Sequence, residues 1–320
     1  MGFSRPATGS SAQPANEGMA PTLVGVVFVL LAITTWGVYF SFAIIVLRKL
    51  TAIEFLMFRW GIGVCTLLLL NLAIRKPLRV AKADWPVVAS AIVIGIVVHQ
   101  LLQVNGLKYT TSTNTGWILT TIPPITGALG WIFLRERLRV RQIVGLIIAM
   151  TGVTLFVTNG NLSEMSLGNN LGDLLVFGSV FTWSIYTILT KSRLGRYDAL
   201  GISIVYMLWG FGTFILLKLF ESGLQIPSLT TAEWLIMLGI GVFPSGLAYY
   251  WWNAGLQRLT AVNTSMFLFI EAIVASSVGA LMLGDVFSTA MVGFALLIVI
   301  GVSVAQGVQA RRRVRVDESV

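Results

Sequence analysis

One pattern of residues occurs twice in this chain, at a nearly constant spacing. Trp36-Gly37-Val38-Tyr39 lies inside one apolar run, and Trp183-Ser184-Ile185-Tyr186 lies inside another, 147 residues later. Gly106-Leu107 returns in the same way as Gly255-Leu256, at an offset of 149 residues. A duplication in fixed register predicts two halves of the same fold. In membrane proteins built from such halves, the binding site lies where the halves meet.

The apolar runs have the length of membrane spans. Apolar residues make up 56% of the chain and charged residues 11%, whereas soluble domains carry about 25% charged residues. Each run is close to the ~20 residues that cross a bilayer as a helix. The runs cover residues 22–47, 52–74, 85–105, 112–134 and 142–158, and then 171–190, 199–220, 233–252, 261–283 and 288–308. We therefore expect an all-α integral membrane protein with ten transmembrane helices, five in each half.

The runs divide the chain into five segments. A flexible polar tail, 1–21, precedes the first five-helix repeat, 22–158. A loop rich in Asn, Ser and Gly, 159–170, leads to the second repeat, 171–308, and a basic tail, 309–320, ends the chain.

Basic residues predict the orientation of the chain in the membrane. If the N-terminus is cytoplasmic, seventeen Lys and Arg residues fall in inside segments and four in outside segments. Because inside loops of an inner membrane carry the excess of basic residues, both termini are predicted to be cytoplasmic and the loop 159–170 external. Five spans per half is an odd number, so the second half must insert upside down. The two halves therefore form an inverted repeat, related by a pseudo-two-fold axis in the membrane plane.

Several classes of function lack their sequence signals. The single Cys65 and the single histidine predict neither a disulfide framework nor a metal cluster. We find no Walker loop, no nucleophile elbow, no aqueous domain large enough for an enzyme and no ring of like charges typical of an ion pore. The net charge of +9 sits in short loops between spans, which argues against nucleic-acid binding. We expect no enzyme activity, no cofactor and no metal.

Aromatic residues near the middle of the spans are the first candidates for a site. Trp36 and Trp183 each lie about fourteen residues into a run, with Tyr39 and Tyr186 on the next helical turn. Trp117 lies early in the fourth run. Midplane positions related by a repeat are where transporters build their sites. Packing of the two tryptophans against glycine in a neighbouring helix is an equally open alternative.

Polar residues within the third run form a second candidate group. His99 and Gln103 are spaced i and i+4, so they share one face of a helix. Ionisable residues inside a membrane are expensive and mark functional sites by default. An interhelical hydrogen bond that only stabilises the fold is the alternative. Two polar groups on one face favour a cavity.

Two charged residues lie within spans. Glu271 lies near the middle of the ninth run, and its repeat equivalent is Ile122, beside Pro123-Pro124. An unpaired carboxylate at this depth is a candidate for loading and releasing a proton. The alternative is a structural role, with Glu271 bonded to Arg59 or to a hydroxyl of another helix. Arg59 is predicted to extend toward the outer surface as a structural anchor.

Taken together, these motifs resemble the drug/metabolite transporter superfamily, specifically its ten-helix EamA-type exporters. The first-half motifs are Trp36-Gly37, Arg59, Gly106-Leu107-Lys108-Tyr109-Thr110, Leu134-Arg135-Glu136-Arg137-Leu138 and the stretch from Gly145 to Gly152. The second-half motifs are Trp183, Asn253-Ala254-Gly255-Leu256, Glu271 and Leu283-Gly284-Asp285. The sequence departs from the family pattern at Ala272, where proline is usual after the glutamate, and at Asp285, where glutamate is usual. The resemblance implies export of amino acids or small metabolites through a central cavity.

We therefore expect an inner-membrane secondary transporter that exports amino acids or similar small metabolites by alternating access. The first alternative is efflux of apolar, drug-like compounds, and the second is a non-transporting membrane scaffold or receptor. The expected partners are a small-molecule substrate, the lipid bilayer and, for coupling at Glu271, a proton; the oligomeric state is left open. The candidate substrate-binding residues are Trp36, Tyr39, His99, Gln103, Trp117, Trp183 and Tyr186.

Overall fold

The computed structural model describes residues 19–110, 112–158, 160–161, 171–221, 223–224, 226–283 and 289–306. These residues form helices and no strand, which confirms the prediction of an all-α fold. Most of the predicted loop 159–170, the two predicted tails up to residue 18 and from 307, and Gly284-Asp285 lie outside the described residues.

The helices follow the predicted runs closely. In chain order the α-helices are α1 Met19–Leu47, α2 Ala52–Ile74, α3 Trp85–Ile92, α4 His99–Tyr109, α5 Ser112–Leu119, α6 Ile122–Leu134, α7 Val140–Val157, α8 Leu171–Lys191, α9 Ala199–Glu221, α10 Thr231–Ile240, α11 Ala248–Arg258, α12 Ala261–Met266, α13 Leu268–Leu283 and α14 Thr289–Gln306. Among the described residues, 8 helices are long and apolar enough to cross a membrane, and the apolar helices 122–134 and 140–156 are shorter. The chain is therefore a multi-pass membrane protein by length and composition.

The third and eighth runs extend further as helices than their apolar stretches predict. The helix that begins at Lys82 continues to Tyr109, and the helix that begins at Thr231 continues to Arg258. Each contains a π-helical turn, η2 Val93–Val98 in the first and η4 Gly241–Leu247 in the second, at positions that correspond in the repeat. Pro244 lies inside η4 and cannot donate a backbone hydrogen bond there. Such turns are frequent at functional sites because they interrupt the regular helix.

Two helix starts show how local sequence fixes the ends of the spans. Thr51 and Glu54 form a reciprocal capping box at the start of α2, and Thr230 with Glu233 does the same at α10. Each box satisfies backbone N–H groups that have no partner within the helix. Both boxes therefore mark points where the chain enters the apolar layer.

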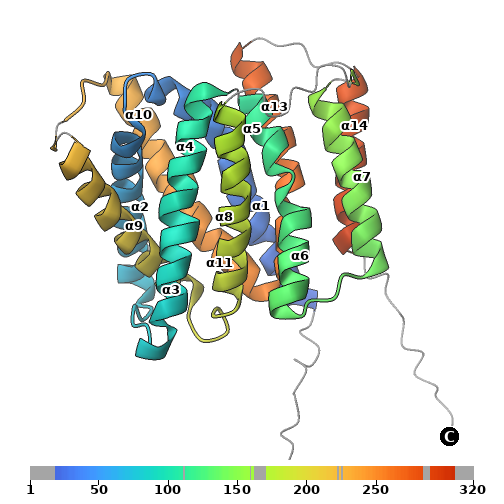
Figure 1. Cartoon of the computed structure of the whole chain (residues 1–320), viewed down its shortest axis with the longest axis horizontal. Helices are drawn as coiled ribbons and strands as arrows, with labels where there is room; N and C mark the ends of the chain where they lie inside the picture. The colour runs from blue at the N-terminus through green and yellow to red at the C-terminus, as the bar shows by residue number, and fades with distance from the viewer. Residues whose placement is uncertain are drawn as a thin grey trace, which may run out of the picture.

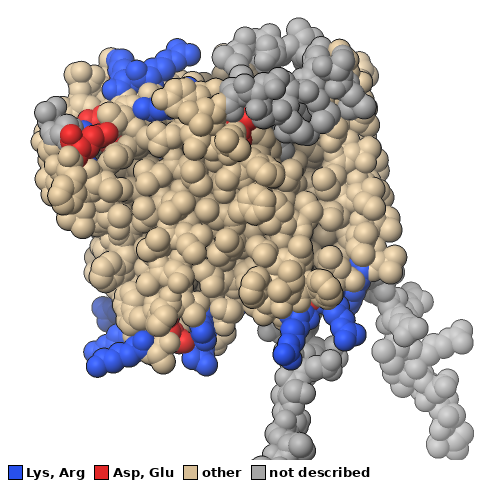
Figure 2. Space-filling view, in the orientation of Figure 1, with Lys and Arg blue, Asp and Glu red and all other residues tan. Residues whose placement is uncertain are grey.

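The helices stand side by side as one bundle (Figure 1). Helices α1, α4, α5, α8, α11 and α13 lie in the middle, α2 and α9 lie toward one end, and α7 with α14 forms the other end. Lys, Arg, Asp and Glu side chains gather along two opposite edges, and the face between them is uncharged (Figure 2). An uncharged belt between charged edges is the surface that a bilayer requires.

Candidate functional site

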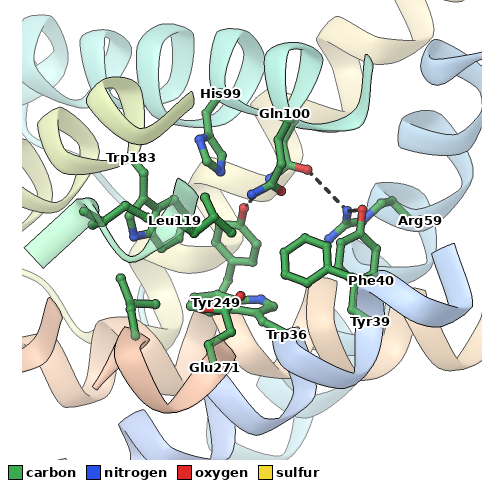
Figure 3. Close-up of a pocket in the computed structure, with 13 residues that line it drawn as sticks. Trp36, Tyr39, Phe40, Arg59, His99, Gln100, Leu119, Trp183, Tyr249 and Glu271 are labelled. Carbon is green, nitrogen blue, oxygen red and sulfur yellow. Dashed lines mark hydrogen bonds between the residues drawn. The ribbon is translucent and has the colours of Figure 1, made fainter. Parts of the chain in front are cut away.

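A cavity of ≈ 30 Å³ lies in the middle of the bundle. Helices α1, α2, α4, α8, α11 and α13 contribute to its wall, together with α5 and the start of α6. The lining residues are Trp36, Tyr39, Phe40, Arg59, His99, Gln100, Gln103, Leu119, Ile122, Trp183, Tyr249, Leu268 and Glu271 (Figure 3). Since one water needs a cavity of about 10–15 Å³, this space holds only about two waters. A ligand of amino-acid size requires the walls to move apart.

Aromatic rings make up one side of the cavity. Trp36 and Trp183 meet edge to face, with ring centroids 5.2 Å apart, and both contact Trp252 at 5.4 Å. Trp36 Nε1 donates a 2.8 Å hydrogen bond to the Pro244 carbonyl oxygen of η4. The two rings thus pack against other aromatic rings and also face the cavity.

The polar residues of α4 point into the same space. His99 Nδ1 lies 3.0 Å from the Ser179 carbonyl oxygen. A carbonyl only accepts, so Nδ1 carries the proton in that bond. Gln100 Nε2 donates to the Tyr249 hydroxyl at 2.8 Å. Gln103 also lines the cavity, so the shared face predicted for His99 and Gln103 is present in the fold.

The prediction that Arg59 extends to the outer surface is wrong. Arg59 is only 2% exposed and lines the cavity. Its Nε donates to Ser245 Oγ at 2.8 Å, and its Nη1 donates to the Tyr39 hydroxyl at 2.6 Å and to Gln100 Oε1 at 3.3 Å. The guanidinium carbon also lies 4.3 Å from the centre of the Tyr39 ring. These three hydrogen bonds to neutral acceptors keep the guanidinium directed inward. An Arg59 side chain that extended toward the surface would lose all three.

Glu271 lies on a different wall from Arg59 (Figure 3). It is 5% exposed and lines the cavity. Within the described part of the chain, its carboxylate makes no hydrogen bond and no ion pair with Arg59. The suggested bond between these two residues is therefore absent from this conformation, although both face one cavity.

Two predicted site residues are placed differently from the rest. Tyr186 does not line the cavity, but its ring packs 5.0 Å from Trp183 and its hydroxyl donates to Asn253 Oδ1. It supports the wall from behind. The backbone of Trp117 lies in α5, and its side chain is outside the described residues.

Several lining residues were not among the predicted ones, and the repeat offset could have found them. Gln100 corresponds to Tyr249, Leu119 to Leu268 and Ile122 to Glu271, each at 149 residues, and both members of every pair line the cavity. Trp36 and Trp183 add a fourth pair at 147 residues. Equivalent positions from both halves therefore surround the same point. Applying the offset to His99, Gln100 and Gln103 would have directed attention to Ala248, Tyr249 and Trp252.

The arrangement suits reversible binding of a small organic molecule. Aromatic faces supply apolar contact, while Arg59, Glu271 and His99 supply a cation, a carboxyl group and an imidazole on separate walls. A site with few polar groups on an apolar lining is the usual form of a small-molecule pocket. Within the described ranges, no group of three or more His, Cys, Asp or Glu residues could hold a metal ion.

Comparison with known proteins agrees with this architecture. Residues 23–158 and 170–305 each match the model of the EamA-like transporter family. A solved crystal structure superposes with a TM-score of 0.71 over 89% of this chain and 96% of the other, at 19% identity, which is similarity of fold.

Curated relatives with sequence similarity are named as transporters. The uncharacterized transporter YyaM of Bacillus subtilis is 28% identical over 218 residues, which is 68% of this chain and 71% of that protein. An uncharacterized transporter of Archaeoglobus fulgidus is 27% identical over 85% of this chain and 95% of its own length. A probable terminal-alkyne amino-acid exporter of Streptantibioticus cattleyicolor is 24% identical over 67% of this chain and 70% of its own. Since the family model covers almost the whole chain in two copies, this protein belongs to the EamA-like transporter family.

Proposed function

We propose that this protein is an inner-membrane secondary transporter that exports amino acids or similar small metabolites. The observation that carries the proposal is the central cavity, in which aromatic faces and three ionisable groups converge from both halves of the chain. The relative named as a probable amino-acid exporter supports the substrate class. Trp36, Tyr39, His99, Gln103 and Trp183 are the proposed substrate contacts; Tyr186 and Trp117 were predicted with them.

The proposal includes ten spans arranged as two inverted repeats, 22–158 and 171–308. Reciprocal glycine contacts support it. A Cβ added at Gly106 would lie 2.9 Å from the Gly172 carbonyl oxygen, and one added at Gly255 would lie 3.0 Å from the Gly25 carbonyl oxygen. Gly25 corresponds to Gly172 and Gly106 to Gly255 in the repeat. Exchanging the halves therefore turns one contact into the other, as a two-fold axis requires.

The direction of that axis follows from α7 and α14, which are equivalent helices. Gly145 on α7 lies against Gly301 on α14, and Gly152 lies against Phe294 and Ile298. Residue numbers rise along one helix as they fall along the other, so equivalent helices run in opposite directions. A rotation that reverses helix direction has its axis perpendicular to the helices, and therefore in the membrane plane.

The contacts also bear on where the termini lie. Gly25, near the start of α1, lies against Arg258. Gln306, at the end of α14, donates to the carbonyl oxygen of Asn263, and Asn263 is only five residues after Arg258 in the chain. Both ends of the described chain thus reach the same edge, and the excess of basic loop residues supports a cytoplasmic position for that edge.

Alternating access around the closed cavity is the proposed mechanism. Two ion pairs that correspond in the repeat bridge the halves, one between Arg196 and Asp84 at 3.1 Å and one between Lys49 and Glu233 at 2.8 Å. They lie on opposite edges in the proposed topology. With both pairs formed, the cavity is small and enclosed, as expected of an intermediate between the inward-open and outward-open states. Opening toward one edge is expected to separate the pair on that edge.

Proton coupling through Glu271 is part of the proposal. Its carboxyl faces the cavity and has no hydrogen-bond partner among the described residues, so it is available to a proton or to substrate. Access from one side at a time would let it take up a proton on one side and release it on the other.

Efflux of apolar, drug-like compounds is the second candidate, and one further observation favours it. An apolar groove of ≈ 460 Å³ between α1 and α10 reaches Tyr39, which also lines the central cavity. Such a groove offers an apolar compound a route from the bilayer.

Reconstituted transport tests the proposal directly. The full chain is placed in proteoliposomes loaded with a panel of labelled amino acids or with a panel of cationic dyes and antibiotics. Faster release of amino acids than from empty liposomes is expected. Release of the drug panel alone would favour the second candidate, and release of neither would favour the scaffold or receptor alternative.

A further inference from the structure

We propose that Arg59 binds the carboxylate of the transported molecule, and that the hydroxyls of Tyr39 and Tyr249 complete this carboxylate site. The inference rests on the proposed function and assigns one chemical group of the substrate to one wall of the cavity.

Arg59 lacks the counter-charge that a buried cation needs. Its three hydrogen bonds go to Ser245, Tyr39 and Gln100, which are all neutral. No described carboxylate forms an ion pair with it, and its Nη2 bonds to no described residue. Burial of an unpaired ion is expensive, and transmembrane charges usually have partners. A bound anion would supply the missing partner.

Two other buried charges in the described part of the chain, both outside the cavity wall, form ion pairs, which Arg59 does not. Lys218 is as buried as Arg59, yet its Nζ lies 2.8 Å from Glu54 and 3.2 Å from Glu221. Asp84 is equally buried and pairs with two arginines. Arg59 differs from both residues in having only neutral hydrogen-bond partners.

The hydrogen-bond directions around Arg59 leave donors facing the cavity. The Tyr39 hydroxyl accepts from Arg59, so its own proton remains free to donate. Gln100 uses its carbonyl oxygen to accept from Arg59 and its amide nitrogen to donate to Tyr249. Tyr249 therefore also keeps its proton for another acceptor. Trp183 Nε1 is a buried donor with no described partner.

A carboxylate fits this set of donors better than other anions. The guanidinium presents parallel N–H groups that match the two oxygens of a carboxylate, and charge-assisted bonds of this kind are among the strongest in proteins. Arg59 is the one Lys or Arg side chain among the lining residues, and Glu271 lies on another wall of the same cavity. Because Arg59 is the one guanidinium of the cavity and Glu271 adds a carboxyl group, the site can balance an anion with a single negative charge. A phosphate would carry more negative charge than this site can balance.

The experiment compares three probes with the same benzyl side chain in proteoliposomes that hold the full chain. Phenylalanine carries a carboxylate and an ammonium group, 3-phenylpropionate keeps only the carboxylate, and phenylalaninamide keeps only the ammonium group. The wild type is expected to prefer each carboxylate probe over the amide by about tenfold or more, the typical value of a charged hydrogen bond. In Arg59→Gln this preference is expected to disappear, while phenylalaninamide transport is retained.

A second variant and a matched control keep the test independent of folding. Tyr39→Phe preserves the ring beneath the guanidinium and removes only the hydroxyl, so KM for phenylalanine should rise about fivefold with KM for the amide unchanged. Lys218→Gln removes an equally buried cation away from the cavity, and its carboxylate preference should equal that of the wild type.

Three results separate the inference from the proposed function. Transport of all probes without preference for the carboxylates leaves the transporter in place and overturns the role of Arg59. A preference that survives in Arg59→Gln overturns it as well. If the wild type moves none of the amino acids or probes, the proposed function fails and the inference fails with it.

Discussion

Replacement of Gly145 by alanine should weaken the packing of α7 against α14 more than a one-carbon change would elsewhere. The new Cβ would lie 2.5 Å from the Gly301 carbonyl oxygen, 2.6 Å from the Ala305 nitrogen and 2.7 Å from the Ala305 Cβ. Two of these three atoms belong to the backbone, so no side-chain rotation can relieve the contact. Overpacking of this kind costs about 1–3 kcal/mol. Close backbone approach at small residues is also what holds membrane helices together.

Gly293→Ala provides the matched control. Gly293 lies on the same helix as Gly301 and has no atom within 4 Å of an added Cβ. Alanine is a better helix former than glycine by about 1 kcal/mol, so this variant should be neutral or slightly more stable. Because the two variants should change the free energy of unfolding in opposite directions, their comparison excludes effects that are common to any Gly→Ala change.

The free energy of unfolding can be measured by SDS titration in mixed micelles, followed by tryptophan fluorescence. Gly145→Ala should unfold at lower SDS than the wild type, and Gly293→Ala at equal or higher SDS. If Gly145→Ala proves as stable as the wild type, the close approach of α7 and α14 is wrong. The contact between α7 and α14 would then no longer support an inverted repeat.

Three further predictions concern transport. Trp36→Ala should reduce transport about fivefold, from the loss of about 1 kcal/mol of aromatic contact, with folded yield on gel filtration unchanged. Loss of folded protein instead would assign Trp36 to packing alone. Glu271→Gln should abolish the response of transport to an imposed pH gradient, and a variant that keeps both rate and response would make Glu271 structural. Each ion pair is expected to hold its edge closed by ~1 kcal/mol, which corresponds to about fivefold in the labelling rate of a cysteine introduced into the cavity. Asp84→Asn should therefore raise labelling from the cytoplasmic side, and Glu233→Gln should raise labelling from the outer side. If both variants raise labelling from the same side, the two pairs do not close opposite edges.

The positions of the helices could be predicted because the bilayer imposes one strong constraint on sequence. Apolar runs of sufficient length mark the spans, and the described helices begin and end within a few residues of them. The exceptions are the ends of the third and eighth runs, where Lys108 and Arg258 lie in helix beyond the apolar stretch. Lipid exposure sets the apolar stretch, whereas a helix continues wherever its backbone hydrogen bonds do.

The cavity was predicted in part, and the error at Arg59 shows why. Hydropathy gives the depth of a residue in the membrane but not the direction in which its side chain points. An arginine seven residues after the start of a span can reach the surface or turn inward. Its inward position depends on Ser245 and Gln100, which come from helices far away in the sequence. Trp36 and Trp183 were found because the repeat marks them without reference to tertiary contacts.

The repeat also shows that equivalent residues of the two halves differ at some positions that line the cavity. Glu271 faces the cavity opposite its equivalent Ile122, and Gln100 faces it opposite its equivalent Tyr249. The reciprocal glycine contacts support the proposed symmetry of the scaffold, in which both halves pack in the same way. A fully symmetric cavity would bind a substrate equally well in two opposite orientations. With the carboxyl of Glu271 supplied by one half and the guanidinium of Arg59 by the other, the proposed site would give a polar substrate one preferred orientation. The cavity would then gain selectivity without any change in the packing of its helices.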